Sequence, residues 1–564
     1  MKNGRVKEIF DAIVVGSGLS GGWAAKELTE KGLKVLLLER GREVKHREDY
    51  PTAMQELWEL PHRGRMDLKT RHDYWANVRT GYTANEEHRH FFTRDVDFPY
   101  EEEKTFTWVR GYQTGGRSLV WGRQSYRWSD LDFEANARDG IAIDWPIRYK
   151  DLAPWYSYVE KFAGISGQRE GWDSLPDGDF QPAMEMNCVE REVKSRLHQA
   201  LGRRMTIGRV ANLTQATPEQ QALGRTSCQF RSRCMRGCPY GAYFSTQSAT
   251  LPAAQRTGNL TLVAGKIVYQ VIFDDAKGRA TGVRAIDQHT KEETEYYGKL
   301  IFLNASAINT AWVMMQSTSR THPDGLGNAS GQLGKNIMDH HKSRGVQGVF
   351  EGFEDRYYYG KRPNGVYIPR FVNMGNDKRD FLRGFGYQGG ASRNAAGSTE
   401  SFGAKLKEEY PRLGPWVFSL QGFGEILPSE SNHFTLSKEK DAWGLPLIRF
   451  DAALTENEYK MKECMVDEAI KMLDAAGLKN ITTYETQKSA PGISVHEMGT
   501  ARMGKDPETS VLNAHNQVWN APNVFVTDGA AMVSASNVNP SLTYMAMAAR
   551  AAAFAVEEMK RGNL

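Results

Sequence analysis

Cysteine is the first residue type whose spacing in this sequence points to chemistry. Cys228, Cys234 and Cys238 form a C-x5-C-x3-C pattern that is followed by proline and flanked by basic residues. Its end matches the C-x3-C-P of the bacterial ferredoxin run, and cationic surroundings stabilise thiolates. Three thiolates suit a [3Fe-4S] cluster, or a [4Fe-4S] cluster with a foreign fourth ligand; Cys188 and Cys464 are distant in sequence but could fold nearby. A structural zinc site and three unrelated buried thiols are the alternatives.

A glycine motif near the N-terminus predicts a nucleotide site. Gly16, Gly18 and Gly21 form G-x-G-x-x-G directly after an apolar run at residues 11–15, which reads as a buried strand. Such glycines permit a tight turn and let a pyrophosphate approach the N-terminus of the following helix. Glu39 ends the next predicted strand, where a carboxylate can accept from ribose hydroxyls. The motif does not separate FAD from NAD, and a glycine-rich turn in an unrelated α/β fold is the alternative.

Four further segments occur in a characteristic order: GGRSLVWG at 115–122, GQLGKNIMDHH at 331–341, HEMGTARMG at 496–504 and NPSLT at 539–543. They resemble the corresponding segments of the glucose–methanol–choline (GMC) oxidoreductases, and the likeness covers nearly the full length. The resemblance implies FAD as the cofactor, two domains, and the oxidation of an alcohol to a carbonyl.

The last two segments are similar to those of the sugar-oxidising branch that includes pyranose 2-oxidase. This resemblance implies that His496 and Asn539 are the catalytic pair that faces flavin N5. Hydride leaves a C–H bond readily only if the adjacent hydroxyl loses its proton, and histidine is the side chain that titrates near neutrality unperturbed. Asn539 can donate to the developing alkoxide. A structural histidine and a turn asparagine before proline are the alternatives.

The resemblance implies further contacts with FAD in the glycine-rich segment, in a strand near residue 268 and after a strand that ends near residue 527. The residues at these positions are Gly115, Gly116, Ser118, Val120, Val268, Asp528 and Gly529. In pyranose 2-oxidase the first of these segments supplies a histidine that tethers FAD covalently. Val120 stands at that position here, so we expect non-covalent FAD. An ordinary turn at 528–529 and a plain core valine at 268 are the alternatives.

The cysteine pattern, followed by Pro-x-Gly-Ala, also resembles a bacterial dehydrogenase branch of this family. Its members are the catalytic subunits of FAD-dependent glucose, gluconate, sorbitol and fructose dehydrogenases, and glucoside 3-dehydrogenase. The branch implies a [3Fe-4S] cluster, an external cytochrome c or quinone acceptor, and a small subunit with a twin-arginine-type signal. We favour a D-glucoside oxidised at C3 as the substrate. Oxidation at C1 of glucose, C2 of gluconate, an oxidase of the pyranose type and an electron carrier without substrate remain open.

These motifs require an α/β fold that brings both ends of the chain together. We expect a Rossmann-like FAD domain over residues 1–345, with an excursion at 44–105 and a cysteine loop at 220–245. A β-rich substrate domain is expected over 346–488, because residues 345–450 are aromatic and alternating. Residues 489–564 then return to the FAD domain with the catalytic pair.

Composition sets limits on partners and location. The 564 residues include 72 basic and 68 acidic side chains, a near balance that gives no sign of nucleic-acid binding. The longest uncharged stretch, residues 529–549, has polar residues in its middle, which argues against a membrane helix. No export signal is recognisable, so the chain's own signals predict the cytoplasm. Co-export with a partner subunit would instead place it in the periplasm.

Overall fold

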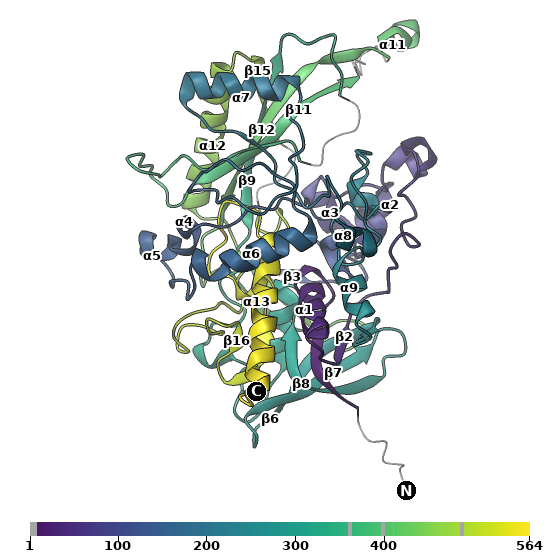
Figure 1. Cartoon of the computed structure of the whole chain (residues 1–564), viewed down its shortest axis with the longest axis vertical. Helices are drawn as coiled ribbons and strands as arrows, with labels where there is room; N and C mark the ends of the chain where they lie inside the picture. The colour runs from purple at the N-terminus through teal and green to yellow at the C-terminus, as the bar shows by residue number, and fades with distance from the viewer. Residues whose placement is uncertain (1–7, 359–363, 396–400, 410, 486–489) are drawn as a thin grey trace.

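The computed structural model describes residues 8–358, 364–395, 401–409, 411–485 and 490–564. A mixed sheet with its helices lies near both chain ends, and a mainly antiparallel sheet lies at the opposite end of the elongated molecule (Figure 1). The first strand and the last helix belong to the same unit, so the two ends of the sequence meet in one domain.

The first sheet has a parallel centre with the order β16-β17-β8-β1-β2-β5, and β6 and β7 extend it from β8 in antiparallel fashion. The strand β1 and its parallel neighbour β2 are short runs of Val, Leu, Ile and Ala, mostly buried, as central parallel strands require. The strands are β1 (Ile9–Val15), β2 (Val35–Leu38), β5 (Leu260–Val263), β6 (Lys266–Asp274), β7 (Arg279–Asp287), β8 (Glu293–Leu303), β16 (Gln517–Val518) and β17 (Ala521–Val526).

The second sheet has the order β15-β9-β12-β11-β10-β4, and its long central strands pair antiparallel. Two helices, α7 (Cys188–Leu201) and α12 (Glu456–Ala475), pack on it and close an apolar core that is separate from that of the first sheet. Its strands are β4 (Thr206–Ile207), β9 (His340–Phe350), β10 (Val366–Ile368), β11 (Phe385–Ala395), β12 (Leu413–Glu425) and β15 (Lys479–Tyr484). A small third sheet joins β3 (Glu101–Glu102), β13 (His433–Lys440) and β14 (Pro446–Asp451).

The α-helices connect and cover these sheets. They are α1 (Leu19–Glu30), α2 (Leu68–Asp73), α3 (Trp75–Thr80), α4 (Asp130–Phe133), α5 (Ala135–Asp139), α6 (Tyr149–Ala163), α7 (Cys188–Leu201), α8 (Pro218–Ala222), α9 (Thr250–Arg256), α10 (Ala307–Gln316), α11 (Gly403–Glu409), α12 (Glu456–Ala475) and α13 (Ser541–Lys560). Of these, α1 links β1 to β2 and packs against α13, which follows the predicted catalytic asparagine. None of the described helices combines the length and the apolar composition needed to cross a membrane.

The predicted α/β fold, with a Rossmann-like unit and a β-rich unit, is confirmed. The aromatic, alternating segment at 345–450 forms β10 to β14, and the segment at 44–105 consists mainly of short helices and turns. The second sheet also takes β4 from an earlier part of the chain, and its first long strand begins at His340. The expected boundary between residues 488 and 489 lies outside the described residues.

Candidate active site

A cavity of about 390 Å³ runs from the glycine motif to the loops that carry the predicted catalytic pair. Most of the residues predicted to bind the cofactor or to act on the substrate line this one space. They are Gly16, Gly18, Glu39, Gly116, Ser118, Val120, Val268, His496, Asp528, Gly529 and Asn539. Gly21 and Gly115 were predicted as well but are not among the lining residues. Segments from the whole length of the chain therefore meet at one cavity.

The glycine loop has the shape that a pyrophosphate needs. A Cβ on Gly21 would lie 1.8 Å from the carbonyl oxygen of Gly16, so only glycine allows α1 to pack this close to the loop. A Cβ on Gly18 would meet no protein atom within 4 Å. Gly18 is also the N-cap of α1, and no side chain caps the helix there. The free N–H groups and the open space at Gly18 fit a phosphate group.

Glu39 lies on the cavity wall and also braces the glycine loop. Its Oε2 accepts the backbone N–H of Ser17 at 3.1 Å, and its Oε1 accepts the backbone N–H of Gly41 at 2.9 Å. Burial raises the pKa of the Glu39 carboxyl, against the effect of these hydrogen bonds. Gly115 donates its N–H to the hydroxyl of Ser17 at 2.8 Å. Gly115 thus ties the second glycine segment to the first rather than lining the cavity.

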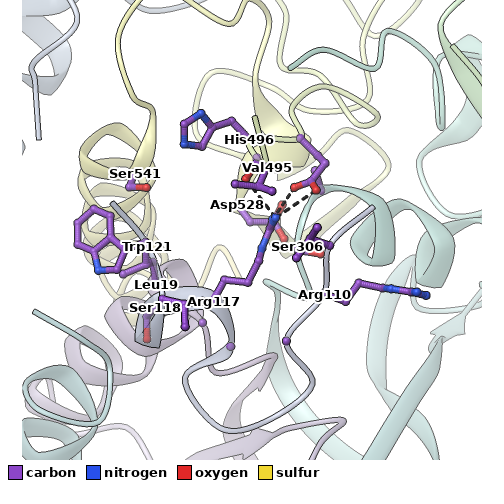
Figure 2. A pocket seen from close by; sticks show the side chains of 18 of the residues that line it. Leu19, Arg110, Arg117, Ser118, Trp121, Ser306, Val495, His496, Asp528 and Ser541 are labelled. Carbon is purple, nitrogen blue, oxygen red and sulfur yellow. Dashed lines mark hydrogen bonds and ion pairs between the residues drawn. The ribbon is translucent and has the colours of Figure 1, made fainter. Parts of the chain in front are cut away.

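His496 is held by contacts between its loop and the start of β9. Its backbone N–H donates to Oδ1 of Asp339 at 3.0 Å, and the N–H of Ser494 donates to Oδ2 of the same carboxylate at 3.0 Å. Met338 and Met498 exchange two backbone hydrogen bonds of 2.9 Å. Figure 2 shows the His496 side chain projecting over the open space of the cavity. The protein therefore fixes the position of the ring through backbone contacts on both sides.

Burial keeps the His496 imidazole neutral. It lowers the pKa of His496 well below the usual value, and the charges of Lys342 and Arg117 act in the same direction. Burial also raises the pKa of Asp339 to about 7 and lowers that of Lys342 to about 8. The sequence argument assumed an ordinary histidine pKa. The structure instead gives a ring that stays deprotonated through the neutral range, in the form that can accept a proton.

Asn539 is oriented by a residue that the sequence did not point out. Gln388, on β11, donates its Nε2–H to Oδ1 of Asn539 at 2.9 Å, which leaves the amide N–H groups of Asn539 as donors. The preceding loop is held by Glu425, whose Oε2 accepts the backbone N–H groups of Ala535 and Ser536, each at 3.1 Å. Both supporting residues come from the second sheet, so that sheet contributes directly to the geometry of Asn539.

An ion pair joins the second glycine segment to the loop of His496. Arg117 pairs with Glu497 through two hydrogen bonds, one of 3.1 Å, and also donates to the carbonyl of Val495 at 3.1 Å (Figure 2). Both residues lie inside the recognised motifs, but their pairing could not be read from the sequence. Asp528 accepts the hydroxyl of Thr310 at 2.6 Å, and burial raises the pKa of its carboxyl to about 6.

Asp339, His340 and His496 place a carboxylate oxygen and two ring nitrogens within 4.8 Å of one another, as a metal site would. The contacts form a hydrogen-bonded network instead. Both carboxylate oxygens accept backbone N–H groups, and the Nδ1 atoms of the two rings face each other at 3.1 Å.

The predicted cluster cysteines lie in one loop, partly buried and free of disulfides. Burial raises the pKa of Cys228 to about 11, and Cys234 and Cys238 add to the rise, so the three thiols affect one another electrostatically. Three free thiols on one short loop are donors that either an iron–sulfur cluster or a zinc ion could use.

The arginines beside the cysteines make contacts that the sequence did not predict. Arg231 donates to the carbonyl of Ala53 at 2.6 Å, and Arg233 donates to the carbonyl of Met54 at 3.1 Å. Arg236 donates to Glu87 at 2.8 Å. These cations anchor the loop to the segment at 44–105. Their guanidinium groups donate to oxygen atoms there, and Arg231 donates to the thioether sulfur of Met54 as well.

Comparisons with known proteins agree with this site. Sequence models of GMC oxidoreductases match residues 10–342 and 428–548. The chain is 30% identical over 556 residues to the 2-methyl-1,2-propanediol dehydrogenase of Mycolicibacterium austroafricanum, covering 96% of this chain and 94% of that protein. It is 26% identical to the fructose dehydrogenase large subunit of Gluconobacter japonicus, over 98% of both chains. Formate oxidase of Aspergillus oryzae shares the fold, with a TM-score of 0.62 over 98% of this chain and 99% of that one, at 14% identity.

The chain therefore belongs to the GMC oxidoreductase family. It is an FAD-dependent oxidoreductase that acts on the CH–OH group of a sugar or alcohol. The residues of the cavity suit FAD. Gly18 leaves open space for a phosphate group, and Glu39 lines the same cavity with a carboxylate that can accept from ribose hydroxyls.

Proposed function

We propose that this protein is a dehydrogenase of a sugar or glycoside, in which His496 removes the hydroxyl proton and Asn539 holds the hydroxyl oxygen. The observation that carries the proposal is that both side chains line the cavity that begins at the glycine motif. Bound FAD supplies the acceptor for the hydride. The neutral imidazole is the proton-accepting form, and the amide of Asn539 presents N–H donors to the developing alkoxide.

We further propose that Cys228, Cys234 and Cys238 hold a [3Fe-4S] cluster that gives electrons an outlet to an external acceptor. The supporting contact is Met235, which directly follows Cys234, lines the same cavity and packs in one apolar cluster with Val120. The cysteine loop is thus in touch with the cofactor cavity on one side. Its other side is anchored to a segment that exposes Trp58, 73% accessible, where a cytochrome c or a quinone could approach.

Within the dehydrogenase branch whose cysteine pattern this chain resembles, we favour the C3 hydroxyl of a D-glucoside as the substrate. The reason is that glucoside 3-dehydrogenases pair a chain of about this size with a small subunit that carries the export signal. Glucose oxidised at C1 and gluconate oxidised at C2 are the competing choices. The test is to add methyl β-D-glucoside, D-glucose, D-gluconate and D-fructose to the purified protein without oxygen, and to follow flavin absorbance. Product NMR then identifies the oxidised carbon. Bleaching by none of these compounds would contradict the proposal.

The same preparation tests the acceptor. Admission of oxygen after bleaching should restore the flavin colour slowly, whereas an oxidase would recover at once. A low-temperature electron paramagnetic resonance spectrum of the oxidised protein should show a [3Fe-4S] signal. If the protein carried FAD but no iron, the proposed hydride chemistry would stand, and the proposal that a cluster is the electron outlet would be wrong.

FAD is proposed to be bound without a covalent bond. Val120 cannot form the histidyl link, and His496 is the only histidine among the described residues that line the cavity. After acid precipitation all the flavin should therefore appear in the supernatant. Yellow colour in the pellet would contradict this.

Finally, we propose a small partner subunit with a twin-arginine-type signal, which would carry the folded chain to the periplasm. The support is the likeness to a protein described as a large subunit, which implies a smaller companion. Expression with and without the companion, followed by fractionation, tests the idea. Export of the chain alone would contradict it.

A further inference from the structure

His340 is a hydrogen-bonding partner of the proposed base. Its Nδ1 lies 3.1 Å from Nδ1 of His496, a hydrogen-bonding distance, and the two rings meet edge to face with centroids 5.0 Å apart. His340 is fully buried, and its ring stacks on Phe423 at a centroid distance of 4.4 Å. This ring therefore has one orientation, and its Nδ1 points at the base.

The backbone that carries His340 also carries the contacts that position His496. Asp339 accepts the N–H of His496, and the paired Met338 and Met498 join the start of β9 to the loop of the base. His340 itself opposes Glu425 in the pairing of β9 with β12. The separation of the two imidazoles is thus fixed by main-chain hydrogen bonds and does not depend on a flexible side chain.

A hydrogen bond between the two facing nitrogens needs one donor and one acceptor, and each neutral ring supplies a single N–H. Burial lowers the pKa of His340 to about 3 and that of His496 well below its usual value. The backbone groups of Ala535, Ser536 and Val538 act on the His340 ring in the direction that favours a proton. Because Nδ1 of His340 faces His496, Nε2 is the nitrogen that can interact with these backbone groups. It makes no hydrogen bond within 3.5 Å to the described residues.

We propose that His340 is a positioning residue that accepts a hydrogen bond from Nδ1–H of His496 and so leaves the lone pair of Nε2 free to act as the base. This rests on the proposed role of His496. In the reverse arrangement His496 would accept at Nδ1 and carry its proton on Nε2, where it could not take another from a substrate. During the reaction the substrate O–H proton passes to Nε2, the C–H hydride passes to the bound FAD, and a carbonyl forms. The bond from Nδ1–H to His340 persists and stabilises the imidazolium.

The charged groups around the pair are few. Asp339 and Lys342 lie on the same strand end as His340, Glu497 follows His496, and Arg117 reaches in from the glycine-rich segment. His340, in contrast, is uncharged, and it is the residue that accepts the hydrogen bond from His496. Its loss should weaken the base, because the protonated form of His496 would lose its partner while the surrounding cations remained.

The first test reads the tautomers directly and needs no substrate. The FAD-loaded protein is labelled with 15N-histidine, and the signals of His340 and His496 are assigned by their loss in His340→Asn and His496→Ala. We expect His496 to carry its proton on Nδ1 and His340 on Nε2. A proton on Nε2 of His496 would overturn the proposal.

The second test uses the sugar that bleaches the flavin fastest and measures the reduction rate against pH. His340→Leu removes the acceptor, whereas His340→Asn keeps an acceptor oxygen near the position of Nδ1. We expect His340→Leu to lose about tenfold or more in limiting rate, with the acid limb of the profile moved to lower pH. His340→Asn should recover most of the rate and the wild-type limb. The control is His341→Leu, an adjacent buried histidine on the same strand, which should leave the profile unchanged.

The outcomes separate the two claims. If His496→Ala reduces flavin at the wild-type rate, the proposed base is wrong. If His496→Ala is inactive but His340→Leu matches the wild type in rate and profile, the base stands and the role of His340 is refuted. An equal loss in the Leu and Asn variants, without movement of the acid limb, would assign His340 a structural role only. If His340→Leu does not bind FAD, the tautomer measurement and the Asn variant still decide.

Discussion

The loop of His496 and the cysteine loop are both held in place by the protein, but in opposite ways. Around His496 the reactive ring itself has a protein partner, and its backbone is bound on both sides by Asp339 and Met338. Around the cysteines the contacts are made by the neighbouring arginines, and Phe230 and Ser232 adopt left-handed backbone conformations. Among the thiols, Sγ of Cys228 accepts the backbone N–H of Phe230 at 3.4 Å, and none of the three forms a disulfide.

If the cysteines hold the proposed cluster, the difference teaches that the protein alone preorganises the first region, whereas the second needs its bound group. A preorganised donor and acceptor set serves a proton transfer without further additions. Burial and the two neighbouring thiols raise the pKa of Cys228, so a bound metal would be needed to hold that residue as a thiolate at neutral pH. The two regions should therefore respond independently to substitution.

The largest expected effect is on the hydride site. His496→Ala should lose at least about 10²-fold in the rate of flavin reduction, the low end for removal of a general base. Asn539→Ala should lose less, because one hydrogen-bond donor is missing. FAD content and the electron paramagnetic resonance signal of the cluster should not change in either variant. A simultaneous loss of cluster in His496→Ala would show that the two regions are coupled.

The next effect concerns the cradle for the cofactor. Gly18→Ala introduces a methyl group into space that no protein atom occupies, so the stability of the apoprotein should be unchanged. The dissociation constant of FAD should rise about tenfold or more, equivalent to about 1.4 kcal/mol. Gly21→Ala is the contrasting variant, because its methyl group would meet the Gly16 carbonyl and lower the stability of the apoprotein itself. If Gly18→Ala bound FAD as tightly as the wild type, the prediction that a phosphate group of FAD binds at Gly18 would be wrong.

The smallest effect is a pH dependence of stability. The pKa of Asp339 is raised to about 7 in the folded protein, so the native state holds a proton there that the unfolded chain has lost above its ordinary value of 3.8. Stability contributed by this group is therefore present at low pH and falls as the pH rises toward 7. Asp339→Asn should show a smaller loss of stability than wild type between about pH 5 and about pH 7, measured by urea unfolding. An identical slope would mean that the carboxylate is ionised throughout.

Sequence reasoning found what is local or marked by residue type. The strands beside the glycine motif and the helix that follows it could be predicted because short patterns carry them. His496 and Asn539 line the cavity, and their catalytic roles stay a prediction. Gln388 could not be predicted, because it lies in the middle of β11 and no motif marks it. Its role depends on the hydrogen bond to Asn539, which is distant in sequence and which only the fold brings near. The same holds for Arg117 and Glu497, which are far apart in sequence and form an ion pair. The contacts of the arginines beside the cysteines could not be predicted either, because charge alone does not tell which acceptor a side chain reaches.

The central claim is that hydride chemistry and electron exit occupy separate regions, and Cys234→Ser tests it most directly. The measurement is the anaerobic rate of flavin reduction by sugar, beside steady turnover with a cytochrome or quinone acceptor, in a variant shown to retain FAD. Cys188→Ser, a distant cysteine at the start of α7, is the control. We predict a wild-type rate of flavin reduction and a collapse of acceptor turnover in Cys234→Ser, because a hydroxyl is a poor cluster ligand. Acceptor turnover as fast as wild type without a cluster, or a loss of flavin reduction with FAD still bound, would contradict the account.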